Sequence, residues 1–161
     1  MKPILELIIP GSPVPQPKHS ARVIAGRACS YMPTSRGKGA QRRSNGIAEF
    51  RALVRKIAAE RYQGPLLECP LAVDCEFVFP RTKGMLWKRK PMPRLPHAVR
   101  PDRDNLDKAV LDALKGVIWR DDQQVSGGTL WKFYAAGGEQ PHTRILISLL
   151  EERTPANDLP W

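Results

Sequence analysis

Cysteine is scarce in this sequence. Only Cys29, Cys69 and Cys75 occur among 161 residues, and no two of them form a CxxC pair. An odd number of cysteines at these spacings argues against both a disulfide framework and a structural zinc cluster. The three histidines are scattered and lie near none of them in the sequence. We therefore expect a protein of a reducing compartment, with a cytoplasmic location.

Long hydrophobic runs are also missing. No stretch approaches the ~20 consecutive apolar residues that cross a membrane, so no membrane partner is expected. The apolar run near the N-terminus is short, lies between Pro3 and Pro10, and is not followed by a small-residue cleavage site. It predicts a first strand rather than a signal peptide.

Acidic residues are absent from two long stretches of a basic chain. Lys and Arg number 26 against 16 Asp and Glu, a net charge of +10. No acid occurs between Glu6 and Glu49, and none occurs in 81–100, which holds seven basic residues. Six of the sixteen acids instead lie in 102–122. A single basic run is usually a solvated surface, but two of them beside a carboxylate cluster indicate nucleic-acid binding. The residues expected to contact DNA are Lys18, Arg22, Arg42, Arg43, Lys88, Arg89, Lys90 and Arg100.

Hydrophobic periodicity predicts one α/β (α+β) domain over 1–150, with a mixed β-sheet, two main helices and a loose tail at 151–161. The chain shows no internal repeat. The expected elements are a strand at 3–10, a long loop at 11–44, a helix at 45–62, a strand at 70–79, a Pro-rich basic loop at 80–101, a helix capped by Asp104, and strands at 123–135 and 142–150.

The acidic segment carries the candidate chemistry. Asp102 and Asp104 lie two residues apart on the extended entry to a helix, so their side chains project to the same side. Hard oxygen ligands in this arrangement suit Mg²⁺ or Mn²⁺. A third carboxylate, from Asp121 or Asp122, completes the site if the chain returns past the start of the helix, which a break at Gly116 allows.

A lysine lies on the same predicted helix face as the first acids. Lys108 follows Asp104 by four residues, and Asp112 lies one more turn along. The Lys108 ammonium is placed to contact the scissile phosphate or to stabilise charge on the leaving oxygen. Asp112 is expected to orient Lys108.

Spacing alone leaves other interpretations open. Acids at the start of a helix stabilise its dipole, and Asp104–Lys108 and Asp112–Lys115 are ordinary helix ion pairs. Asp121-Asp122 fits a solvated turn. A DxD motif also occurs in sugar-nucleotide transferases, although no GxGxxG or GxxxxGK phosphate loop accompanies it here. A nuclease, a DNA-binding protein without catalysis, and a transferase acting on small molecules are thus the alternatives.

The order of the motifs resembles one family. Asp102-Arg103-Asp104-Asn105-Leu106, then Lys108, Leu111-Asp112-Ala113-Leu114, Asp121-Asp122 and Gln124-Val125 resemble the RusA family of Holliday-junction resolvases. The opening IPGSPVPQPKHSAR and the His97 lead-in are similar to that family as well. Arg103 departs from the pattern, because an aliphatic residue is common there, and so does the long, very basic 81–99 loop.

The resemblance implies a Mg²⁺- or Mn²⁺-dependent endodeoxyribonuclease that resolves branched DNA, such as a four-way junction, by paired phosphodiester hydrolysis. It implies a RusA-like fold and a homodimer. Asp102, Asp104 and Asp122 would then be catalytic metal ligands and Lys108 the essential lysine, with Asn105, Asp112 and Asp121 supporting them. The alternative is a catalytically inactive, structure-specific DNA-binding protein.

A homodimer needs an apolar surface, which we expect on the helices or the late strands. Trp131, Phe133 and Tyr134 offer aromatic anchors for such an interface. The alternative is that these three side chains fill the core.

Overall fold

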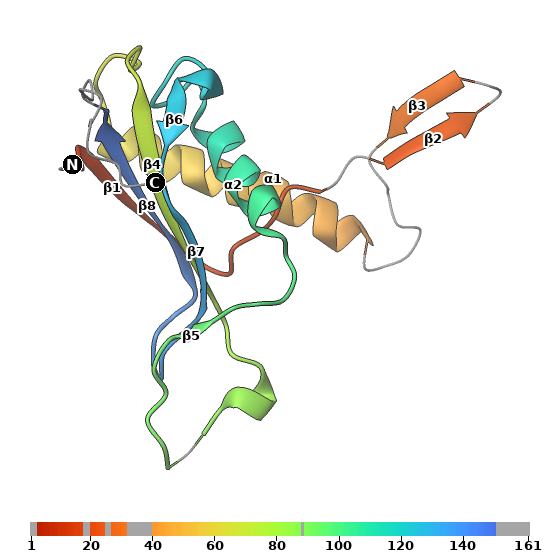
Figure 1. Cartoon of the computed structure of the whole chain (residues 1–161), viewed down its shortest axis with the longest axis vertical. Coiled ribbons are helices and arrows are strands. Elements are labelled where there is room, and N and C mark those ends of the chain that lie inside the picture. The colour runs from red at the N-terminus through yellow and green to blue at the C-terminus, as the bar shows by residue number, and fades with distance from the viewer. Residues whose placement is uncertain (1–2, 18–19, 25–26, 32–39, 88, 151–161) are drawn as a thin grey trace, which may run out of the picture.

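A mixed β-sheet forms the frame of the protein (Figure 1). The computed structural model describes residues 3–17, 20–24, 27–31, 40–87 and 89–150. Six strands form the sheet, in the order β1-β8-β4-β7-β5, with β6 also paired to β4. Strands β1 and β8 run antiparallel to their neighbours, whereas β4 pairs in parallel with β6 and β7. The strands are β1 (Leu5–Pro10), β4 (Leu71–Phe79), β5 (Leu95–Pro96), β6 (Val125–Gly127), β7 (Leu130–Tyr134) and β8 (His142–Leu149).

Two helices, α1 (Ala40–Arg61) and α2 (Arg103–Leu114), cover one face of this sheet (Figure 1). The apolar positions that the periodicity predicts do point inward: Phe50, Val54 and Ala58 of α1 are buried, and so is the α2 stripe of Leu106, Ala109, Val110, Ala113 and Leu114. They pack against alternate residues of β1, β4 and β8. The predicted mixed sheet and two main helices of a single α+β domain are thus confirmed.

Two local predictions were wrong in the first third of the chain. The expected loop at 11–44 contains a hairpin of β2 (Ser20–Ile24) and β3 (Arg27–Tyr31), whose strands pair with each other. The helix begins at Ala40 rather than residue 45. Ala, Gln and Arg at 40–43 are good helix formers, but they lack the apolar periodicity on which the prediction depended.

The predicted strand at 123–135 is divided in two. Residues Asp122–Gln124 form a short 3₁₀ helix, η2, and β6 is separated from β7 by Gly128 and Thr129. Gly128 has φ +137°, and a Cβ there would lie 1.9 Å from the Val73 carbonyl oxygen. The chain therefore passes so close to β4 that only glycine fits. In the 80–101 loop, a second 3₁₀ turn, η1 (Lys83–Met85), and β5 are also ordered.

Candidate functional site

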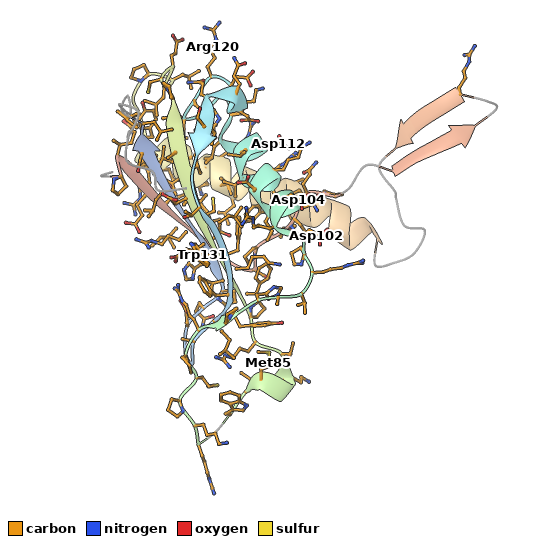
Figure 2. The ribbon with its side chains drawn as sticks, viewed as in Figure 1. Met85, Asp102, Asp104, Asp112, Arg120 and Trp131 are labelled. Atoms are coloured by element: carbon orange, nitrogen blue, oxygen red, sulfur yellow. The ribbon has the colours of Figure 1, made fainter. Side chains whose placement is uncertain are left out.

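The start of α2 carries the first two acids (Figure 2). Asp102 is the N-cap residue, with extended backbone at φ −69° and ψ 146°, and Asp104 lies in the first turn. The prediction that Asp104 caps the helix was therefore wrong. The Asp102 side chain makes no capping hydrogen bond to the helix, and both residues are exposed. Helix capping thus does not account for these two acids.

Asn105 links Asp104 to the opening loop. Its side-chain amide donates to Asp104 Oδ1 at 3.3 Å, and its backbone carbonyl accepts from the Gln16 amide at 2.8 Å. Gln16 is itself buried, so this loop packs firmly against the first turn of the helix. Asn105 is thereby placed to orient the Asp104 carboxylate, a role that the sequence motif alone does not reveal.

A hollow of about 340 Å³ opens beside Asp104. Asp107 also lines it, together with Gly128 and Thr129 from the β6–β7 connection. Burial raises the pKa of the half-buried Asp107 carboxyl, and the Arg103 charge opposes that rise. The sequence motif did not single out Asp107, although its spacing of three from Asp104 is a signal that could have placed both acids on one helix face.

The next turns of α2 separate the lysine from its expected partner. Lys108 is exposed one turn beyond Asp104. Asp112 does not orient it: the Asp112 carboxylate forms an ion pair with Arg51 of α1. Arg55 also approaches the Asp112 and Lys115 carbonyls, each at 3.5 Å. Asp112 therefore joins the two helices.

Asp121 and Asp122 lie at the opposite end of α2. Lys115, the C-cap of the helix, contacts Asp121 at 3.0 Å, and Trp119 Nε1 donates to Asp122 Oδ1 at 3.0 Å. Asp121 also caps η2 by accepting from the Gln123 amide. The Lys115 contact and this cap lower the pKa of the Asp121 carboxyl. Both carboxylates thus have structural partners.

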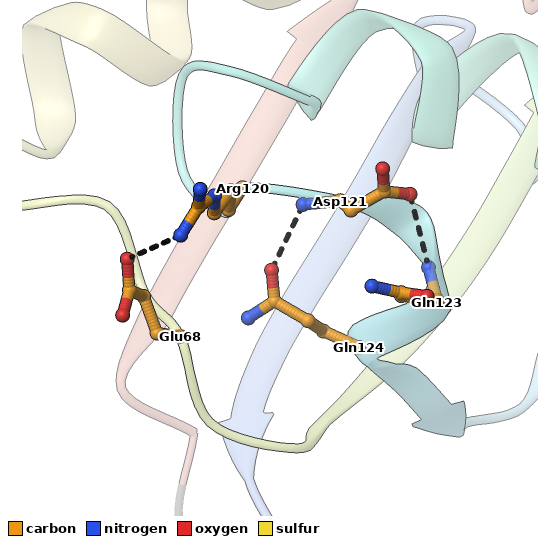
Figure 3. A pocket seen from close by; sticks show the side chains of 5 residues that line it. All are labelled: Glu68, Arg120, Asp121, Gln123 and Gln124. Carbon is orange, nitrogen blue, oxygen red and sulfur yellow. Dashed lines mark hydrogen bonds and ion pairs between the residues drawn. The ribbon is translucent and has the colours of Figure 1, made fainter.

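Gln124, the glutamine at the close of the motif, also has structural partners. Gln124 accepts from the Asp121 amide at 2.8 Å and donates to the Leu67 carbonyl at 2.7 Å. Figure 3 shows this corner, where Asp121, Gln123 and Gln124 line a hollow of about 360 Å³ beside the Arg120–Glu68 ion pair. The close of the motif therefore holds η2 against the 67–69 segment.

A single chain does not gather the three predicted metal ligands. The twelve residues of α2 span about 18 Å, with Asp102 and Asp104 at one end and Asp122 beyond the other. No group of three Asp, Glu, His or Cys side chains among the described residues is arranged to hold a metal ion. The Gly116 break, where φ is +73°, turns the chain at the C-terminal end of α2 but does not return it to the start.

Three of the predicted DNA-contacting residues, Arg89, Lys90 and Arg100, are exposed on the 80–101 loop. Arg22 lies in β2, and Arg42 and Arg43 lie in α1, but their side chains are outside the described part of the structure. Lys18 and Lys88 are outside it altogether. That these eight residues contact DNA stays a prediction.

The aromatic residues of β7 divide between two faces of the sheet. Trp131 is 57% exposed and stacks on Phe133 at 6.1 Å between ring centroids. Tyr134 points the other way, packs against the core and lies 4.5 Å from the His97 ring. Trp131 and Phe133 thus remain candidates for an interface, whereas Tyr134 belongs to the interior.

Comparison with known proteins agrees with the motif order. The family model described as Endodeoxyribonuclease RusA matches residues 10–148. An uncharacterized protein of Bacillus subtilis (strain 168), YqaN, is 28% identical over 103 residues, which cover 61% of this chain and 70% of the relative. Within the described residues, no helix is long and apolar enough to span a membrane.

Proposed function

Because the chain belongs to the RusA family of endodeoxyribonucleases, we propose that it cuts Holliday junctions by metal-dependent hydrolysis of phosphodiester bonds. The observation that supports this proposal most is the exposed pair Asp102 and Asp104 at the start of α2, in a chain of net charge +10. A basic surface attracts the DNA backbone, and a local pair of carboxylates supplies what a metal needs next to a phosphate.

The donor set at the start of α2 fits a hard divalent cation. Asp102 and Asp104 offer carboxylate oxygens, and Asn105 holds the second of them at 3.3 Å. Mg²⁺ is commonly bound by only one or two carboxylates and keeps its remaining ligands as water and phosphate oxygens. When bound, such an ion lowers the pKa of a water and polarises the phosphate. The residues of this chain would orient that ion and the DNA.

Lys108 would provide a second positive charge. It is exposed on the turn of α2 that follows Asp104, so a phosphate bound near Asp104 lies within the range of a long lysine side chain. A compact ammonium suits an oxygen on which charge develops during bond cleavage.

A homodimer would bring Asp122 of one chain next to Asp102 and Asp104 of the other. Two symmetric cuts need two sites, and a two-fold pair of chains presents its surfaces reciprocally. In such a pair, Asp122 of the partner subunit would complete the site that Asp102 and Asp104 begin. Its hydrogen bond from the buried Trp119 would hold the carboxylate in a fixed orientation for that contact.

A synthetic four-way junction and a linear duplex of the same sequence test the activity. We expect cutting of the junction alone, only with Mg²⁺ or Mn²⁺. Asp102→Asn should lower the rate by about 10³-fold, since a lost metal ligand costs several kcal/mol of barrier. It should bind the junction at least as tightly, because it removes negative charge beside a polyanion. An Asp102→Asn protein that cuts at the wild-type rate would contradict the proposal, and junction binding without cutting by the wild type would favour the inactive binding protein.

Mixed dimers test the shared site. We expect a heterodimer of Asp102→Asn and Asp122→Asn chains, isolated with two affinity tags, to nick the junction, because one of its two sites keeps all three acids. Each mutant homodimer should be inactive. If the acids of a site come from one chain, both sites of this heterodimer are broken and it cuts nothing. The matched control pairs Asp102→Asn with Asp104→Asn, which damages both sites in either arrangement.

A further inference from the structure

The backbone that leads into Asp102 is held from one side by a lysine of the sheet. Lys132 of β7 donates from its ammonium to the Val99 carbonyl at 2.8 Å and to the Pro101 carbonyl at 2.6 Å. The carbonyl carbon of Pro101 is bonded directly to the amide nitrogen of Asp102. The second hydrogen bond therefore fixes the peptide plane from which the Asp102 residue begins.

The strand that carries Lys132 is held on both sides. Strand β7 pairs with both β4 and β5, and the Lys132 carbonyl accepts from the His97 amide at 2.9 Å. The His97 ring is buried between Phe79 and Tyr134, with centroid distances of 4.2 and 4.5 Å. The chain is thus anchored at His97, while residues 98–100 are exposed. Lys132 ties this exposed stretch back to the sheet at the Val99 and Pro101 carbonyls.

We infer that Lys132 is a positioning residue for Asp102: its ammonium clamps the 99–101 backbone so that the Asp102 carboxylate is held where the metal binds. This inference rests on the proposed function. A lysine is suited to the task because one ammonium carries three N–H donors and can serve two carbonyls at once, through hydrogen bonds strengthened by charge.

The clamp matters because catalytic groups tolerate little displacement. A misplacement of about 1 Å can lower a rate by ~10²-fold. Without the ammonium, the Val99 and Pro101 carbonyls would turn toward water. The start of α2 would then move together with the exposed residues 98–100. Asn105 and Gln16 would still hold the first turn through their 2.8 Å backbone bond. We therefore expect loss of Lys132 to affect Asp102 more than Asp104.

Lys132→Met tests the clamp, because methionine is similar in length and has no donor. The matched control is Arg81→Met: Arg81 likewise donates to loop carbonyls, at Ala135 (2.7 Å) and Met85 (3.3 Å), away from the acids. The primary readout is the affinity of the intact protein for Mn²⁺ without DNA, measured by electron paramagnetic resonance. The second readout is the Mn²⁺ concentration that gives half-maximal cutting in single turnovers on saturating junction.

We expect Lys132→Met to weaken Mn²⁺ binding at least tenfold, to raise the half-saturating Mn²⁺ concentration to match, and to leave metal-free junction affinity within twofold. Arg81→Met should leave Mn²⁺ affinity unchanged even where its melting temperature falls equally. If methionine prevents folding, Lys132→Gln, whose shorter amide reaches only one carbonyl, should weaken Mn²⁺ binding at least threefold.

Unchanged Mn²⁺ affinity in a folded Lys132 variant would overturn the clamp, as would an equal loss in Arg81→Met. These results leave the proposed function standing, because wild-type protein would still bind Mn²⁺ and cut the junction. Wild-type protein that neither binds Mn²⁺ nor cuts would overturn the proposed function, and the role of Lys132 with it.

Discussion

The two ends of α2 carry the same residue type in different surroundings. At the C-terminal end, Asp112 meets Arg51, Asp121 meets Lys115, and Asp122 accepts from Trp119. At the N-terminal end, Asp104 accepts from the neutral side-chain amide of Asn105. Asp107 faces a hollow, and burial raises the pKa of its carboxyl. Asp112, Asp121 and Asp122 thus bind side chains that hold the C-terminal end of α2 in place, whereas Asp104 and Asp107 line a hollow.

This difference separates Asp112 and Asp121, whose ion pairs belong to the fold, from Asp104 and Asp107, which line a hollow that can take a ligand. Asp122 is held by Trp119 and is the acid that we propose for the site of the partner subunit. Removing one partner of a partly buried ion pair destabilises the folded state more than removing one partner of an exposed pair, because it leaves the other charge uncompensated. A carboxylate whose pKa is raised by burial makes the folded state less stable when it ionises, and such groups cluster at functional sites. A DxD spacing does not distinguish the two cases, but the partners of each carboxylate do.

The largest expected effect sharpens the functional side of this comparison. Lys108→Ala should lower the single-turnover rate on saturating junction by roughly 10²–10³-fold, as loss of one charge-stabilising donor does. Lys108→Arg should recover only part of the rate, because its planar fork does not place the charge at the same point. Lys56→Ala, an exposed lysine of α1 paired with Glu60, is the control and should cut normally. Wild-type cutting by Lys108→Ala would remove the lysine from the site.

A smaller effect is expected at the C-terminal end of α2, and it concerns stability. Asp112→Asn breaks the ion pair to Arg51, in which both side chains are 30% exposed. We expect a loss of about 1–2 kcal/mol in the free energy of unfolding, between the values for exposed and buried pairs, with junction cutting retained. Urea denaturation measures it, and a double-mutant cycle with Arg51→Ala isolates the pair. Glu60→Gln, which removes the exposed Lys56 pair, should cost less. Loss of cutting in a stable Asp112→Asn protein would break the comparison.

The smallest effect has the opposite sign. The pKa of Asp107 is raised in the folded state above its ordinary value of 3.8. In the pH window just above 3.8, the folded protein therefore binds more protons than the unfolded chain. Stability therefore falls as pH rises through that window. Asp107→Asn removes this penalty and should raise the urea midpoint slightly at pH 7, with a gain that shrinks as pH falls toward 3.8. An Asp107→Asn protein that is less stable at pH 7 would show that this carboxylate stabilises the fold as Asp112 does.

Much of the architecture could be predicted because burial imposes a period on the sequence. The stripe from Leu106 to Leu114 packs as predicted. The strand predicted at 70–79 forms as β4, but seven of its nine residues are buried instead of every second one. The β2–β3 hairpin could not be predicted from a stretch that also resembles a Pro- and Gly-rich loop. The division of the late strand at Gly128 depends on the Val73 backbone, which is distant in sequence.

The sequence by itself determined the family, the placement of Asp102 and Asp104 at the start of a helix, and the basic character of the chain, because motif order, helix-start signals and charge are local properties. Only the tertiary structure decided which side chains each acid contacts. Asp112 and Arg51 lie 61 residues apart in sequence, and Lys132 reaches Pro101 from a strand 31 residues away. Such contacts arise when helices and strands pack, and no local pattern of residues encodes them. The separation of Asp122 from Asp102 has the same cause: a straight helix holds its two ends apart, and packing of Trp119 and Gln124 fixes where the chain goes next.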